Sequence, residues 1–339
     1  LAGLTVGELL PRERVLIAAQ QLDWSAADPS FIVTNASDTR TGCCSEDGDS
    51  VLAGYSTDGG RSWRKFGTLP TPPGTKPDDP WRMAFGMIAV AADNPDNIVW
   101  SPTYYRSPFY TLDRGKSWSR VVLPGERLPF TGTHGDWWMP RKVLAADRVL
   151  PATFYLFHSG NGDNPGLLGL WKTSDGGRSW RRVYDRAIAP HNTFAAKLHA
   201  VPGHAGHLYF TSSVAEGTDT RLRRSTDGGK TWEALDQVTR VDDIAFGKAA
   251  TGAHYPALYV SGRISGDYGI WRSIDQGASW RKIGQFPTGK LDQVSVVGAD
   301  PDVFGRVYLG YKGSGWTYGE PAPCDRAVRT PQEECVGVD

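Results

Sequence analysis

The sequence is poor in methionine and cysteine and has no excess of charge of either sign. Its 339 residues include three Met and four Cys, and 37 Lys and Arg balance 37 Asp and Glu. Without net charge the chain lacks the basic surface that binds nucleic acid or anionic membranes, so we expect neither as a partner. No apolar run reaches the roughly 18 residues of a membrane-spanning helix, so we also expect no membrane insertion.

The few cysteines lie in two local pairs, Cys43 with Cys44 and Cys324 with Cys335. An even number is consistent with an oxidising compartment, and we expect a secreted or periplasmic protein. A bond between Cys324 and Cys335 closes a short loop and is the disulfide we predict. A bond between adjacent Cys43 and Cys44 would be strained. The alternatives are pairing of that site with the tail, and four reduced thiols.

Glycine and tryptophan, by contrast, are abundant, with 40 Gly and 13 Trp. Five of the Trp end copies of one pattern: Ser/Thr, any residue, Asp, any residue, Gly, any residue, Ser/Thr, Trp. The copies are residues 56–63, 111–118, 173–180, 225–232 and 273–280. The Asp can accept hydrogen bonds from the N–H groups of its own turn, Gly can adopt φ > 0, and Trp can cover the apolar side of a hairpin. The pattern therefore predicts five tight hairpin turns.

The spacing of these turns predicts the fold class. Their Asp residues lie 55, 62, 52 and 48 positions apart, which suits one four-stranded sheet plus its loops. We predict an all-β fold: a β-propeller of six four-stranded blades, or of seven if residues 1–20 or a long loop contain another hairpin. Residues 1–319 would form one domain and residues 320–339 a tail tied by the disulfide.

The last predicted blade has one strand too few. After the fifth copy, residues 293–297, 307–311 and 316–318 have strand patterns, and no fourth strand follows. A propeller closes by pairing its two chain ends, so we expect residues 15–19 to supply the missing strand.

The repeat resembles the Asp box of sialidases, sortilin-type receptors and several glycoside hydrolase propellers. Its five Asp residues are therefore expected to shape turns on the outside of blades and not to catalyse. Longer stretches give a more specific resemblance, to the carboxy-terminal lobe of glycoside hydrolase family 74, and the match runs in order through residues 20–319. The stretches are 21–29, 144–149, 201–208, 244–250 with 255–260, and 300–319.

The family resemblance implies two β-propeller lobes facing across an open cleft. It also implies hydrolysis of xyloglucan and related β-1,4-glucans with inversion, by one catalytic Asp from each lobe. The amino-terminal lobe has no counterpart in this sequence, so we expect a second propeller lobe as a partner. The family's second acid lies in a Gly-Asp-(Ile/Val)-Gly-Gly-Phe segment just upstream of residues 21–29. No clean copy of that segment occurs here, and Val6-Gly7-Glu8 is the candidate that comes nearest to it.

Two carboxylates are the candidates for catalysis. Inverting hydrolysis needs two carboxyl groups roughly 6.5–9.5 Å apart. Asp136 lies between His134 and Trp137 in a long loop, where burial against indole rings would raise its pKa. Asp23, beside Trp24, is expected at the start of a strand that lines the central channel. The structural alternatives are a turn-capping role for Asp136 and a buried Asp23 bonded to the backbone.

Aromatic residues in loops and at strand ends are the candidates for stacking on sugar rings, with packing inside the blades as the alternative. Arg82 and His134, which lie near these aromatic residues in the sequence, are added to the set. The predicted substrate-binding residues are Trp81, Arg82, Tyr104, Tyr105, His134, Trp137, Trp138 and Trp316. The seven His show no metal-ligand spacing, so we predict no metal site and no cofactor. We predict a glycan-active hydrolase of the xyloglucanase type. The alternative is a non-catalytic propeller that serves as a binding or assembly module.

Overall fold

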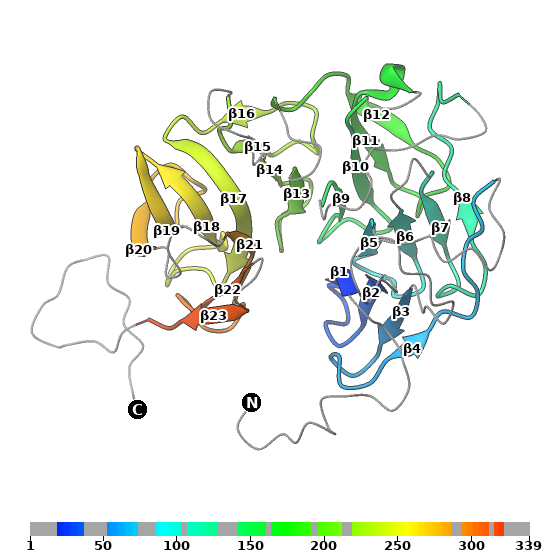
Figure 1. Cartoon of the computed structure of the whole chain (residues 1–339), viewed down its shortest axis with the longest axis horizontal. Coiled ribbons are helices and arrows are strands. Elements are labelled where there is room, and N and C mark those ends of the chain that lie inside the picture. Colours follow the sequence, from blue (N-terminus) through cyan, green and yellow to red (C-terminus); the bar gives the residue numbers. More distant parts are fainter. Residues whose placement is uncertain are drawn as a thin grey trace, which may run out of the picture. The chain divides into compact units, whose positions relative to one another are not determined.

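The computed structural model describes residues 19–36, 53–73, 86–102, 107–127, 142–160, 164–190, 196–211, 219–285, 293–311 and 315–321. These residues form antiparallel β-strands and one short 3-10 helix, η1 (Pro165–Leu167). The chain divides into two compact units, residues 1–187 (unit 1) and residues 188–339 (unit 2), each with three sheets. Figure 1 shows the strands of each unit.

Unit 1 has three four-stranded sheets, in which the strands follow one another in chain order. The first contains β1 (Ala19–Trp24), β2 (Ile32–Ala36), β3 (Ala53–Ser56) and β4 (Arg64–Lys65). The second contains β5 (Met87–Val90), β6 (Ile98–Ser101), β7 (Phe109–Thr111) and β8 (Ser119–Arg120). The third contains β9 (Leu144–Ala146), β10 (Phe154–His158), β11 (Gly169–Thr173) and β12 (Arg181–Tyr184).

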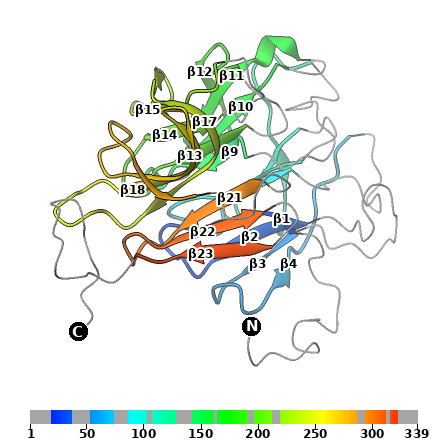
Figure 2. The same ribbon diagram turned by 60° about the vertical axis from the view of Figure 1, so that its left-hand side comes forward.

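Unit 2 has two four-stranded sheets and a sheet with three described strands. The first contains β13 (Lys197–Ala200), β14 (Leu208–Thr211), β15 (Arg223–Ser225) and β16 (Glu233–Ala234). The second contains β17 (Val238–Gly247), β18 (Ala257–Ile264), β19 (Asp267–Ser273) and β20 (Arg281–Gly284). The third contains β21 (Val294–Ala299), β22 (Val307–Tyr311) and β23 (Trp316–Gly319), which lie side by side in Figure 2.

The sheets are blades of a β-propeller, and the prediction of an all-β fold with six blades is confirmed. The strand predicted to close the propeller, residues 15–19, lies outside the described residues except for Ala19. Its last residue, Ala19, begins β1 and pairs with Ala36 of β2.

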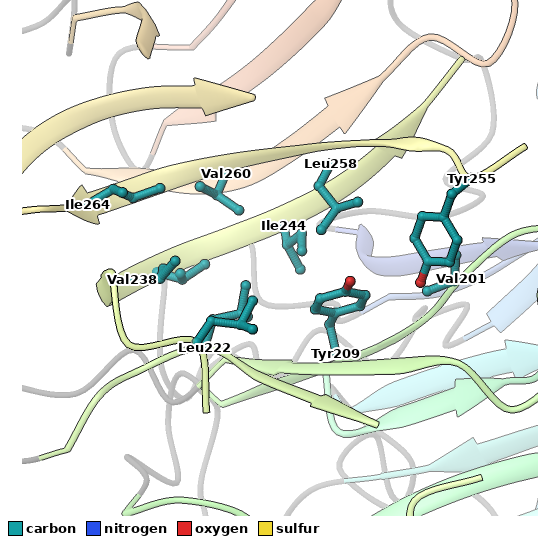
Figure 3. Close-up of a cluster of buried hydrophobic side chains, with 11 residues drawn as sticks. Val201, Tyr209, Leu222, Val238, Ile244, Tyr255, Leu258, Val260 and Ile264 are labelled. Atoms are coloured by element: carbon teal, nitrogen blue, oxygen red, sulfur yellow. The ribbon is translucent and has the colours of Figure 1, made fainter. Parts of the chain in front are cut away.

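Apolar side chains between neighbouring sheets form the cores of the two units. All four residues of β5 are buried, because β5 lies between β1 and β9 within unit 1. In unit 2, Figure 3 shows Ile244 of β17 and Leu258 and Val260 of β18 pointing toward Leu222 and Tyr209. Packing of sheet faces thus fixes how consecutive blades of one unit lie against each other.

The predicted hairpin turns are confirmed, and each joins the third strand of its sheet to the fourth. In the first copy, Asp58 accepts hydrogen bonds from the Ser62 N–H at 2.9 Å and from the Ser56 hydroxyl at 2.7 Å. The Gly60 N–H donates to Ser56 Oγ at 2.8 Å, and Gly60 has φ +89°. Such bonds stabilise the ionised carboxylate. In the second copy, they lower the pKa of Asp113 to about 2, the Ser117 hydroxyl contributing most.

Candidate functional site

Two of the residues predicted for catalysis or substrate binding, Asp23 and Trp316, are among the described residues. The others lie outside them, as do both cysteines of the predicted disulfide, and their roles stay predictions. They are Trp81, Arg82, Tyr104, Tyr105, His134, Asp136, Trp137, Trp138, Cys324 and Cys335.

Asp23 is buried, with 2% of its surface exposed, and both of its carboxylate oxygens are engaged. The Val90 N–H of β5 donates to Oδ2 at 3.0 Å. The Arg148 guanidinium forms an ion pair with Oδ1, and it also donates to the Trp24 carbonyl at 2.8 Å. The guanidinium carbon lies 4.6 Å from the centre of the Trp24 ring. Asp23 thus ties β1 to β5 and to the residues that follow β9.

The position of Asp23 along its strand differs from the prediction. We expected it at a strand start, but β1 begins at Ala19 and Asp23 is its next-to-last residue. The reason is that residues 19–24 pair with β2 as one strand across a register shift between Ala19 and Gln21. The contacts of Asp23 correspond to the structural alternative stated for it, and its catalytic role stays a prediction.

The pairing of Asp23 with Asp136 stays a prediction, because Asp136 lies outside the described residues. Asp23 contacts Val90, at the end of β5. Where the chain is described again after the loop that contains Asp136, the Val143 N–H donates to the Met87 sulfur, at the start of β5, at 3.0 Å. These two contacts lie at opposite ends of β5.

Unit 2 contains a second buried aspartate, Asp243 of β17, which the sequence reasoning did not select as a site residue. Its Oδ1 lies 3.0 Å from His199 Nε2 and 3.3 Å from the Lys197 ammonium, both on β13. Its Oδ2 accepts the Val297 N–H of β21 at 2.9 Å. Because a carboxylate can only accept, His199 Nε2 carries the proton of their bond. We call Lys197, His199 and Asp243 the Asp243 cluster.

The electrostatics of the Asp243 cluster favour an ionised carboxylate. Burial alone would raise the pKa of Asp243, which is 2% exposed. The Lys197 charge, the hydrogen bond and charge of His199, and the Val297 N–H outweigh burial and hold the pKa well below its usual range. The sequence did carry a signal: Asp242 and Asp243 stand between the apolar residues Val241 and Ile244. Lys197 and His199, two residues apart, share one face of their strand.

The neighbouring Asp242 makes separate contacts. Arg240 Nε donates to its Oδ1 at 3.0 Å, and the hydroxyls of Ser261 and Tyr268 donate to its Oδ2. Burial, together with the charge and hydrogen bond of Asp242, raises the pKa of Tyr268 to about 12. Adjacent acids on one strand thus serve two networks, since successive side chains point to opposite faces.

Trp316 lies in β23 with 63% of its surface exposed. Its ring centre is 6.1 Å from that of Tyr318, which is 6.2 Å from that of Tyr308 on β22. The sequence reasoning singled out Trp316 but neither tyrosine. Exposed rings suit stacking on pyranose faces, and substrate binding by Trp316 stays a prediction.

Within the described residues, no group of three or more His, Cys, Asp or Glu side chains is placed to hold a metal ion. A search of the same residues finds no helix that is long and apolar enough to cross a membrane.

Comparisons with known proteins point to one family. The BNR/Asp-box repeat family matches residues 223–234. A xyloglucanase of Paenibacillus sp is 30% identical over 95% of this chain and 27% of its own length. Xyloglucanase Xgh74A of Acetivibrio thermocellus is 34% identical over 84% of this chain and 29% of its own length. The chain therefore spans less than a third of the length of either relative.

A solved structure supports the same relationship. The GH74 xyloglucanase from Xanthomonas campestris superposes with a TM-score of 0.64 and 29% identity, over 89% of this chain and 37% of that protein. The match covers nearly all the blades described above and not only the repeated turn. The chain is a GH74-like β-propeller region.

Proposed function

We propose that this chain is one propeller lobe of a xyloglucanase-type glycoside hydrolase, acting on a β-linked polysaccharide or oligosaccharide such as xyloglucan. The observation that carries the proposal is the extent of the similarity, which spans 95% of the chain in a xyloglucanase. Asp-box turns alone would not support it, because folds that share such repeats serve many functions.

Hydrolysis of this type needs two carboxyl groups, one to protonate the leaving oxygen and one to activate water. Within this lobe Asp136 is the stronger candidate, because both oxygens of Asp23 are already engaged by Val90 and Arg148. The second carboxylate would come from a further lobe, since each xyloglucanase relative is more than three times as long as its match to this chain. Trp316 and the loop aromatics would then bind the glycan by stacking.

A non-catalytic role is the second candidate, in which the lobe binds a glycan or joins an assembly without hydrolysing it. The engagement of Asp23 and the lack of a clean copy of the family's acidic segment favour it. We further propose a secreted or periplasmic location, which polymeric glycan substrates and the even number of cysteines support.

The test is to incubate this lobe, together with the further lobe that would supply the second carboxylate, with xyloglucan, cellulose and mixed-linkage β-glucan, and to measure new reducing ends and glycan affinity. An Asp136→Asn variant should abolish hydrolysis and retain glycan binding, whereas Asp185→Asn, which changes an exposed acid after β12, should retain both. Binding without product in the unaltered protein would favour the non-catalytic role. Neither product nor binding with any of the three glycans would contradict the proposal.

A further inference from the structure

The three first strands of unit 2 meet at a single side chain. Asp243 of β17 accepts hydrogen bonds from His199 on β13 and from the Val297 N–H on β21, at 3.0 and 2.9 Å. Lys197 reinforces this junction, because its ammonium lies 3.3 Å from Asp243 and donates to the Ser295 carbonyl of β21 at 2.5 Å. One carboxylate thus connects three consecutive blades.

At this junction the positive charge of Lys197 balances the negative charge of Asp243. Lys197 and His199 have side chains 13% exposed, and the Asp243 side chain is 3% exposed. Around neutral pH an ammonium and a carboxylate cancel, and His199 needs only its neutral Nε2–H to donate. Asp242 and Arg240, which also lie on β17, pair with each other at 3.0 Å, so this pair has no net charge. On β21 the cluster is faced by backbone groups of Ser295 and Val297.

We propose that the Asp243 cluster is a clasp that couples the three blades of unit 2. Lys197 is the cation that neutralises Asp243, and His199 can replace it by taking up a proton. If Lys197 loses its charge, Asp243 remains buried without a cation within the cluster. A buried carboxylate without a neutralising cation is costly, and His199, already bonded to it, is the neighbouring group that can take up a proton. The charge of Asp243 is then neutralised only when His199 is protonated.

The proposal predicts a pH dependence that the unaltered protein lacks. In a Lys197→Met variant the Asp243 carboxylate, no longer neutralised by the ammonium, would raise the pKa of His199 above its value in the unfolded chain. Such a group contributes stability that is fully present below the unfolded pKa and is lost as pH rises through the folded pKa. The variant should therefore melt at least about 5 °C higher at pH 5 than at pH 8, beyond any change in the unaltered protein.

The experiment compares melting temperatures at pH 5, 6.5 and 8 for four proteins: unaltered, Lys197→Met, Lys197→Met/His199→Gln, and Lys248→Met. Lys248 is an exposed lysine of the same unit, and its variant should follow the unaltered protein. The double variant should lose the recovery at pH 5, because glutamine cannot take up a proton. Lys197→Met that loses no stability, or that loses the same amount at every pH, would overturn the proposal, as would recovery that persists without His199.

A further variant keeps the proposal testable if Lys197→Met folds at neither pH. Lys197→Met/Asp243→Asn removes both charges and leaves no buried ion, so it should fold and show no recovery at pH 5. If this neutral pair also fails to fold, the damage does not come from an unbalanced charge and the clasp is refuted.

Discussion

In each unit of this protein a buried aspartate joins consecutive blades, but the two aspartates have different cations. In unit 1, Asp23 accepts the Val90 N–H and pairs with Arg148. In unit 2, Asp243 accepts the Val297 N–H and contacts Lys197 and His199. A guanidinium keeps its charge at every ordinary pH, whereas imidazole titrates near neutrality. In unit 1 the buried carboxylate is therefore neutralised by a cation whose charge does not change with pH. In unit 2 it lies in a cluster that contains a titratable histidine.

The largest effect is expected from Asp243→Asn, which should lower the free energy of unfolding by about 3–5 kcal/mol at pH 7, because Lys197 loses its anion. Hydrogen exchange should accelerate together in β13, β17 and β21. Because the folded pKa of Asp243 lies below its unfolded value, its contribution exists above about pH 4 and is lost as pH falls further. The difference from the unaltered protein should therefore shrink below about pH 4.

Asp302→Asn, which changes an exposed acid of the same unit, is the matched control and should unfold like the unaltered protein. Faster exchange confined to β17 in Asp243→Asn would show that the aspartate does not couple the three blades.

A somewhat smaller effect is expected from Arg148→Met in unit 1, about 2–4 kcal/mol, because it leaves the buried Asp23 carboxylate without a cation. Among the described residues no histidine contacts Asp23 or Arg148. The loss of stability should therefore be nearly the same at pH 5 and pH 8. Urea denaturation at both values, with exposed Arg61→Met as control, measures it. If Arg148→Met regained stability at pH 5 as Lys197→Met is expected to, the two units would not differ in the pH dependence of their buried aspartates.

The smallest difference is expected between two Asp-box glycines that occupy the same position of the turn, one in each unit. Gly115 and Gly277 both have positive φ, so alanine costs roughly 1–2 kcal/mol at either. In unit 1 the new Cβ would also lie 2.5 Å from the ring of buried Phe66, whereas in unit 2 it would lie 2.6 Å from a terminal methyl of Leu235. Since a methyl can rotate away more easily than a packed ring, Gly115→Ala should cost about 1–2 kcal/mol more than Gly277→Ala.

Thermal melts of the two variants measure this difference. Gly125→Ala, at φ +90° with open space around the new Cβ, isolates the backbone cost. Equal losses for Gly115→Ala and Gly277→Ala would show that the ring of Phe66 yields as readily as the Leu235 methyl.

The repeated turns could be predicted from the sequence because their chemistry is local. In each, Ser or Thr, Asp, Gly and Ser or Thr lie within eight residues, and the hydrogen bonds between them involve only that segment. Their spacing then indicated sheets of four strands and a propeller. The first strand was harder to place, because residues 19–24 mix polar and apolar residues and only pairing with β2 shows where β1 begins.

The sequence by itself determined the fold class, the five Asp-box turns and the likeness to one family, because all three depend on short patterns repeated along the chain. Only the tertiary structure decided what the buried acids contact. Asp23 and Arg148 are 125 residues apart in the sequence, and Asp243 and Val297 are 54 residues apart, so no local sequence pattern predicts either contact. Such contacts form only when separate blades pack together, and burial between blades is what makes each of these charges require a partner.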